Sequence, residues 1–232
     1  MNLGVRTALW SGGGILIPKV GLLLNNNLDD LSGNFKFSIS QGSLAYVDDS
    51  PIAGQNALET TGFLATAVGD YGVLPTTGDY SYASFTKMHE GIAESTAWSY
   101  FGYGLATADN CNNLKHCNRQ NRYTVQNYWF GNDSEYHVDM YLPELKFTDW
   151  HSYVWVYSGG THRLYIDGVF RFSRKITRTP SFAQTNLCVG RSSYTVDYMW
   201  NGLLSNIALY DVALKEKQIS QFAAGGINCV KV

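Results

Sequence analysis

Aromatic and amide side chains gather in one segment of the chain, NRYTVQNYWFGNDSEYH. The aromatic residues of this segment that could contact a ligand are Tyr123, Tyr128, Trp129 and Tyr136. An aromatic ring can stack on the apolar face of a sugar, while amides and carboxylates bond its hydroxyl groups. The segment therefore predicts a glycan-binding site. The alternative is that alternate residues of a strand simply enter the core.

Catalytic residues are harder to assemble from this sequence. A glycosidase needs a pair of carboxylates flanking the bond it cleaves. A serine hydrolase of the common type carries the motif Gly-x-Ser-x-Gly, which this sequence lacks. Metal-ligand spacing is absent from the histidines, which are His89, His116, His137, His151 and His162. We therefore expect no enzymatic activity and no required cofactor.

The cysteines leave two interpretations open. Cys111 and Cys117 flank the polar stretch CNNLKHC, which we expect to be a loop within residues 105–122. This loop could close a disulfide in an oxidising setting, or bind a metal together with His116, although zinc favours four ligands at tighter spacing. Cys188 lies in the strand-like run NLCVG and is expected to be a buried thiol.

Composition and charge exclude several classes of protein. The chain has 232 residues, of which 45% are hydrophobic and only 16% are charged, against about 25% charged in a typical soluble domain. A net charge of -2 gives no electrostatic basis for nucleic-acid binding. No apolar run reaches the roughly 18 residues of a membrane-spanning helix, so membrane insertion is not expected.

The first residues form an apolar stretch that Gly12–Gly14, Pro18 and Lys19 interrupt. A secretory signal would need an unbroken apolar run of roughly 7–15 residues, so this stretch is not expected to be one. We interpret residues 1–21 as an arm ahead of a single domain over residues 22–224, and residues 225–232 as a C-terminal tail.

The elements that must position these residues are mostly strands. Short apolar runs recur between Gly, Asn and Asp residues, which is typical of a β-sandwich or barrel. The runs cover residues 21–24, 35–40, 57–60, 80–87, 98–103, 122–129, 136–142, 152–157, 163–166, 169–173, 187–189 and 202–209. One helix is predicted over 212–222, with Asp211 as its cap and Gly225-Gly226 as its end.

The stretch WHSYVWVYSGGTHRLYIDGVFRF predicts three strands joined by tight turns at Gly159-Gly160 and Asp167-Gly168. In this register Tyr157 faces His162, Trp155 faces Leu164 and Tyr153 faces Ile166. Because strand side chains alternate, the second apolar face cannot share the same core. That second face carries Val154, Val156, Tyr165, Phe170 and Phe172.

This stretch and the C-terminal third of the chain resemble the laminin-G-like and pentraxin-like branch of the concanavalin A-like jelly rolls. The resemblance rests on Trp150-His151, LYIDG at 164–168, LCVGR at 187–191 and NGLLSNIALYDVALKEKQISQF at 201–222, with DLSGN at 30–34. It covers roughly residues 22 to 224. It implies an all-β fold, a two-sheet antiparallel jelly-roll sandwich with one short C-terminal helix.

The resemblance implies that Trp155, Leu164 and Ile166 lie in the core, so the second apolar face lies outside it. This face could be covered by the middle segment or the N-terminal arm, by a protein partner, or by a small ligand. Exposed contiguous apolar surface generally marks an interaction site.

Members of this family often bind calcium near the loop that opens the domain. The matching residues here are Asp29, Asp30 and Asn34. Calcium takes six to eight oxygen ligands, so neighbouring groups would have to contribute. The alternative is a turn whose Asp and Asn side chains bond its own backbone.

The family also contains laminarinase-like hydrolases that carry Glu-x-Asp-x-x-Glu on one strand. That motif is absent, and Glu135, Asp139 and Glu144 have the wrong spacing.

We therefore predict a non-catalytic structural or adhesion subunit on the exterior of a larger assembly, such as a phage or viral particle. It would be oligomeric and contact other subunits through residues 1–20 or the outer sheet face, and it could also bind host-surface glycans. One alternative is a free-standing, extracellular, lectin-like module. Another is a polysaccharide-degrading enzyme of the same fold.

Overall fold

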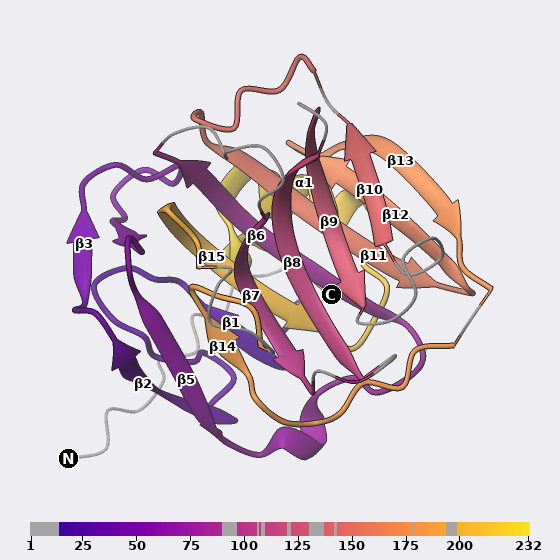
Figure 1. Ribbon diagram of the computed structural model, residues 1–232, viewed down its shortest axis with the longest axis horizontal. Coiled ribbons are helices and arrows are strands. Elements are labelled where there is room, and N and C mark those ends of the chain that lie inside the picture. The colour runs from indigo at the N-terminus through magenta and orange to yellow at the C-terminus, as the bar shows by residue number, and fades with distance from the viewer. Residues whose placement is uncertain are drawn as a thin grey trace.

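The chain folds as a sandwich of two antiparallel sheets with one helix packed on the outside (Figure 1). A computed structural model describes residues 14–89, 97–105, 107, 110–119, 122–129, 137–141, 143–177, 179–193 and 199–232. Figure 1 shows the seven-stranded sheet in front, the eight-stranded sheet behind it, and the helix α1 behind both. The predicted all-β sandwich with one C-terminal helix is confirmed.

The two sheets draw their strands from along the whole chain. The eight-stranded sheet has the order β13-β12-β11-β6-β15-β4-β3, with β1 also paired to β15, and the seven-stranded sheet has the order β10-β9-β8-β7-β14-β5-β2. The strands are β1 Val20–Leu22, β2 Phe35–Gln41, β3 Ala45–Val47, β4 Ala57–Glu59, β5 Leu64–Gly69, β6 Tyr80–Met88, β7 Ala97–Gly104, β8 Cys111–Arg119, β9 Arg122–Trp129, β10 His137–Tyr141, β11 His151–Ser158, β12 Thr161–Ile166, β13 Val169–Lys175, β14 Cys188–Val189 and β15 Gly202–Tyr210. The helices are α1 Glu216–Gly225 and two single 3-10 turns, η1 Tyr71–Val73 and η2 Ile227–Cys229. No helix among the described residues is long and apolar enough to cross a membrane.

The predicted hairpins of the β11–β13 stretch are confirmed. Tyr157 pairs with His162, and Trp155 pairs with Leu164. The turn at Gly159 and Gly160 has φ values of 55° and 74°. Glycine adopts this left-handed region without steric cost, which allows a two-residue turn between antiparallel strands.

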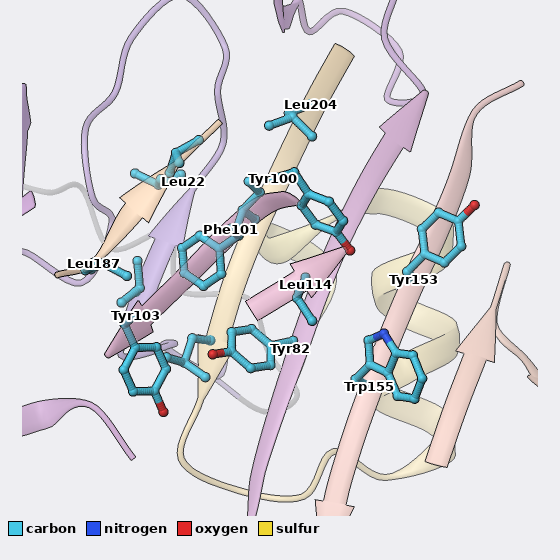
Figure 2. Packing of buried hydrophobic residues seen from close by; sticks show 14 of the residues in the cluster. Leu22, Tyr82, Tyr100, Phe101, Tyr103, Leu114, Tyr153, Trp155, Leu187 and Leu204 are labelled. Carbon is cyan, nitrogen blue, oxygen red and sulfur yellow. The ribbon is translucent and has the colours of Figure 1, made fainter. Parts of the chain in front are cut away.

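Large aromatic rings fill the space between the sheets. Figure 2 shows Tyr82, Tyr100, Phe101, Tyr153 and Trp155 among the side chains of this core, and each is at most 1% exposed. At about 25 cal/mol for each Å² of buried apolar surface, such rings supply much of the stabilisation of the sandwich. The prediction that the face with Trp155 enters the core is therefore confirmed.

The second apolar face is covered by the chain itself. The prediction that it meets a partner or ligand is therefore wrong for most of its residues. Val154, Val156 and Tyr165 are 0%, 3% and 7% exposed. They belong to a second cluster with residues of α1, η2 and the C-terminus. Within this cluster Phe222 of α1 stacks on Phe85 of β6, with ring centroids 5.0 Å apart. The cover includes the C-terminal helix, which the sequence interpretation did not consider for this role, and Leu16 of the predicted N-terminal arm packs against the same cluster.

A bulge changes the side on which Phe172 lies. The register between β12 and β13 shifts between Leu164 and Tyr165, so that Leu164 pairs with Phe172 and Tyr165 pairs with Phe170. Phe172 therefore packs against the core between the sheets and not on the outer face. Phe170 alone of the five predicted residues is exposed, at 50%, beside the ring of Tyr165.

The helix α1 begins and ends later than the predicted 212–222. Gln218 accepts a hydrogen bond from the backbone N–H of Lys215 at 2.9 Å, which closes the first turn. Gly226, with φ of 72°, follows the last turn, and its N–H bonds the carbonyl of Phe222. A residue in this left-handed conformation commonly ends a helix.

The described part of the predicted arm, residues 14–21, is built into the domain. Val20 pairs with Leu209 of β15, and Ile15 pairs with Lys231 near the C-terminus. The predicted tail, residues 225–232, is likewise packed in place, with Ile227 and Val230 at most 1% exposed.

Candidate functional site

The predicted aromatic cluster is divided between the two faces of β9. Trp129 is 1% exposed and points into the core, where its Nε1 donates to the hydroxyl of Tyr80 at 3.2 Å. Tyr123 also packs against the core, with its ring 5.7 Å from that of Phe147. Only Tyr128 has the opposite orientation, toward the outer face of the seven-stranded sheet. Tyr136 lies outside the described residues.

The stretch CNNLKHC is a strand and not a loop. It forms most of β8, which lies between β7 and β9. Its polar side chains are buried: Asn112 and Asn113 are 0% exposed and Lys115 is 3% exposed. The polar sequence predicted a loop because such residues usually remain in solvent.

The predicted disulfide between Cys111 and Cys117 is wrong, because both are thiols in the structure. They lie six positions apart on one extended strand, which separates their Cα atoms by about 20 Å. A disulfide requires Cα atoms about 4.4–6.8 Å apart.

The metal alternative fails for a related reason, since His116 points to the other side of β8. It lies in the core among aromatic rings, 4.9 Å from those of Tyr153 and Trp200. This burial lowers the pKa of His116 to about 3. Among the described residues no three His, Cys, Asp or Glu side chains are grouped to hold a metal ion.

The predicted calcium residues form a loop whose polar groups are already bonded to one another. The Oδ1 of Asp30 accepts from the backbone N–H groups of Gly21 at 2.8 Å and Ser32 at 3.2 Å. Its Oδ2 accepts from the hydroxyl of Ser32 and from the N–H of Phe35. Asp30 therefore has no oxygen free of a donor.

The other two residues of this loop are also engaged. Asp29 accepts from the amide of Asn27 at 2.9 Å, and Asn34 donates its amide to the carbonyl of Lys19 at 3.0 Å. Both aspartates line a surface cavity of about 600 Å³ with Phe35, Phe37 and other residues of β2. The hydrogen bonds of these side chains fit the alternative, a turn whose Asp and Asn side chains bond its own backbone, better than they fit a calcium site.

A row of residues crosses the outer face of the seven-stranded sheet at right angles to the strands. The backbone register aligns Thr66 of β5, Cys188 of β14, Gly102 of β7, Asn113 of β8 and Tyr128 of β9. Gly102 is required there, because a Cβ atom would lie 2.1 Å from the Oδ1 of Asn113. The Asn113 side chain thus lies over the glycine.

The next row holds a cation beside an aromatic ring. Lys115 pairs with Gln126, and its Nζ lies 3.5 Å from the centroid of the Tyr128 ring. Such cation–π contacts are stronger where water is excluded. The thiol of Cys117 donates to the Oε1 of Gln126 at 3.0 Å, and the Nε2 of Gln126 has no partner among the described residues. The cation–π contact therefore orders Tyr128 on the outer face.

A polar cavity of about 240 Å³ opens at one end of this row, and we call it the outer-face cavity. Its described lining consists of Thr66, Ala67, Tyr71, Asn186, Leu187, Cys188, Arg191 and Ser193. Thr66 and Cys188 belong to the outer face of the sheet, whereas Arg191 and Ser193 come from the segment after β14.

Hydrogen bonds fix the shape of this cavity. The N–H of Ser193 donates to the Oδ1 of Asn113 at 2.8 Å, which ties the segment after β14 to the sheet. Tyr71 donates its hydroxyl to the carbonyl of Ala67, which holds its ring at the cavity. The Oγ atoms of Thr66 and Ser40 lie 2.7 Å apart. These contacts hold an aromatic ring beside hydroxyl, amide and guanidinium groups.

The sequence interpretation named Cys188 only as a buried thiol and assigned no binding role to any residue of this cavity. Arg191 was quoted only as the last residue of LCVGR, and Thr66 and Tyr71 lie outside every motif. The available signal was the combination of Gly190 and Arg191 directly after a buried strand, because a glycine can turn the chain out of the sheet there.

Comparisons with known proteins agree with this architecture. A comparison with curated proteins finds no match. Among solved structures, domain 4 of AbnA, a GH43 extracellular arabinanase from Geobacillus stearothermophilus in complex with arabinotriose, is 19% identical with a TM-score of 0.61. The match covers 88% of this chain and 100% of that domain.

Toxin domains of the same fold are similar to this chain over part of their length. The binding domain of botulinum neurotoxin DC in complex with SialylT is 12% identical with a TM-score of 0.64, over 89% of this chain and 51% of that one. The receptor-binding domain of botulinum neurotoxin type G is 13% identical with a TM-score of 0.61, over 89% of this chain and 50% of that one. The chain thus spans about half the length of these toxin domains.

One family profile matches the sequence itself over residues 60–220, which is more than half of the chain. Together with the two-sheet sandwich, this match shows that the chain belongs to the concanavalin A-like lectin/glucanases superfamily, in its laminin G-like branch.

Proposed function

We propose that the protein is a non-catalytic carbohydrate-recognition domain that binds a glycan on the outer face of its seven-stranded sheet. The observation that carries the proposal is the outer-face cavity, which Tyr71 lines together with Thr66, Asn186, Arg191 and Ser193. A ring with hydroxyl and amide groups around it matches a sugar, which has apolar faces and a rim of hydroxyl groups.

The opposite sheet supports the same choice of face. Its outer side is filled by α1 and the C-terminal residues, which leave no apolar platform around Val154 and Val156. That covering removes one of the two surfaces predicted for docking to an assembly, the outer sheet face, of which Phe170 at the hairpin tip remains exposed. Of the other predicted surface, residues 1–20, the first thirteen lie outside the described residues. We therefore favour the lectin-like module over the assembly subunit, and the location on a virion stays a prediction without support.

The neighbours supply a second line of support. The arabinanase domain was observed with arabinotriose, and a toxin binding domain with SialylT. We extend glycan recognition to this chain on the strength of its cavity and not of their low sequence identity. By analogy with the extracellular arabinanase, we propose that the domain acts outside the cell.

Binding without cleavage is proposed from the lining of the cavity. No described lining residue is an aspartate or a glutamate, so the described part of the lining offers no carboxylate pair of the kind that a glycosidase uses. We therefore propose recognition alone, with no cofactor.

A hydroxyl deletion tests the proposed site. The protein is screened on an array of plant, bacterial and animal glycans, and the best ligand is then titrated by calorimetry against Thr66→Val. Loss of one hydrogen bond should weaken binding by about two- to tenfold. Thr161→Val on β12 of the other sheet is the matched control and should bind normally. Absence of any bound glycan, or equal affinity of Thr66→Val and the parent protein, would refute the proposal.

A further inference from the structure

Arg191 is the one cation in the described lining of the outer-face cavity, and the backbone fixes its position. Gly190 has φ of 91°, and a Cβ atom there would lie 2.4 Å from the carbonyl oxygen of Phe63. This glycine turns the chain directly after β14 and places Arg191 at the cavity. The N–H of Gly190 donates to the carbonyl of Tyr100 at 2.9 Å, and its own carbonyl accepts from Trp200 at 2.8 Å. Both bonds tie the turn to the core.

The charge of Arg191 is not balanced within the described part of the chain. No described carboxylate lies within ion-pair distance of its guanidinium, and none lines the cavity. The acidic group beside it is the thiol of Cys188, which is 1% exposed. Burial raises the pKa of this thiol to about 12, so it stays neutral and leaves the charge of Arg191 in place.

Two donors at this cavity also lack acceptors. The Nε of Arg191 and the Oγ of Ser193 are both buried and make no hydrogen bond among the described residues. A buried donor without an acceptor costs about 1–3 kcal/mol, and more when the group is charged. Such a cost is offset when a ligand supplies the acceptors.

We propose that the outer-face cavity selects a sugar that bears a carboxylate, such as a uronic or sialic acid, with Arg191 and Ser193 binding the acid group. This inference rests on the proposed glycan recognition and adds its substrate class. A guanidinium presents parallel N–H groups that match the two oxygens of a carboxylate, and such charge-assisted bonds are about twice as strong as neutral ones. The ring of Tyr71 then contacts the sugar.

Paired ligands test the acid preference. Short oligogalacturonides are compared by calorimetry with galacto-oligosaccharides that lack the acid, and 3′-sialyllactose is compared with lactose. At least one acid should bind the parent protein about tenfold or more tightly than its neutral counterpart. Raising the salt concentration should reduce this preference, because salt screens the ion pair.

Three variants locate the preference. Arg191→Gln keeps hydrogen-bonding capacity without charge and should lose about ten- to a hundredfold in affinity for the acid, a much larger loss than for neutral sugars. Ser193→Ala should lose less, in the same direction. Arg171→Gln on the exposed strand β13 removes an equal charge far from the cavity and should bind both sugars like the parent protein.

The outcomes separate this inference from the proposed function. Equal binding of acidic and neutral sugars, or an acid preference that survives Arg191→Gln, would overturn the inference and leave glycan recognition standing. Failure to bind any glycan would overturn both. If Arg191→Gln does not fold, as judged by its melting temperature, Ser193→Ala still decides, because it must lower the ratio of acid to neutral affinity.

Discussion

Two buried histidines should make the stability of the domain depend on pH. His116 and His162 are each 1% exposed, and burial lowers the pKa of each to about 3 from 6.5. The ring nitrogens of His116 have no hydrogen-bond partner among the described residues, and charge on the nearby His151 lowers its pKa further. His162 has a contact between its Nε2 and the hydroxyl of Tyr80 at 3.3 Å. Both rings must therefore be neutral in the folded protein.

The sign and size of the effect come from proton linkage. Below pH 6.5 the unfolded chain binds protons at both histidines, whereas the folded chain does not until about pH 3. Stability is therefore lost as the pH falls through this window. At about pH 5 each histidine should cost about 2 kcal/mol relative to pH 8, or about 4 kcal/mol for the pair.

The titration of Asp167 falls outside this window. Burial raises the pKa of Asp167, but the hydrogen bonds from His151 and Ser152 and the nearby positive charges together lower it below its usual value. It is ionised in both folded and unfolded states between pH 5 and 8, so its contribution is lost only at lower pH.

Urea unfolding at about pH 8 and about pH 5 measures the effect, and variants assign it. His116→Phe keeps a ring among its aromatic neighbours, and His162→Gln keeps a polar group beside Tyr80. The double variant should lose most of the difference in unfolding free energy, while His89→Gln, at an exposed histidine, should keep it. Equal stability of the parent protein at both pH values, or an unchanged difference in the double variant, would refute the reasoning.

Other predictions concern the helix, the opening loop and the thiols. Phe222→Ala removes the ring stacked on Phe85 and should lower the unfolding free energy by about 3–5 kcal/mol, measured by urea unfolding. Asp30→Ala removes the acceptor of three backbone N–H groups and should lower the melting temperature, whereas a chelator should leave that of the parent protein unchanged; a chelator-induced drop would restore the calcium hypothesis. A reductant should leave the melting temperature unchanged, and a thiol reagent should label the partly exposed Cys229 before the three buried cysteines; a reductant-induced drop would contradict the thiol state.

The sequence predicted the parts of the fold that depend on local patterns. Strand alternation and the turns at Gly159-Gly160 and Asp167-Gly168 predicted the register of β11 and β12 correctly. The bulge beside Leu164 was not predictable from alternation, since a single extra residue reverses every later side chain. For this reason Phe172 was placed on the wrong face.

Long-range packing was the other source of error. The helix was predicted, but the fact that it covers Val154 and Val156 depends on how the chain returns across the sheet. The polar strand β8 was taken for a loop because its partners, such as Trp200 beside His116, lie far away in sequence. The outer-face cavity was missed for the same reason, since Thr66 and Arg191 come together only in the folded chain.

The contact between the two ends of the described chain has a mechanical consequence. The N–H of Val232 bonds the carbonyl of Gly14, and that of Leu16 bonds the carbonyl of Val230, both at 2.9 Å in an antiparallel bridge. Because both ends leave this bridge on the same side, force that pulls them apart would break its hydrogen bonds one after another and not all at once. The domain would thus yield first at this seam.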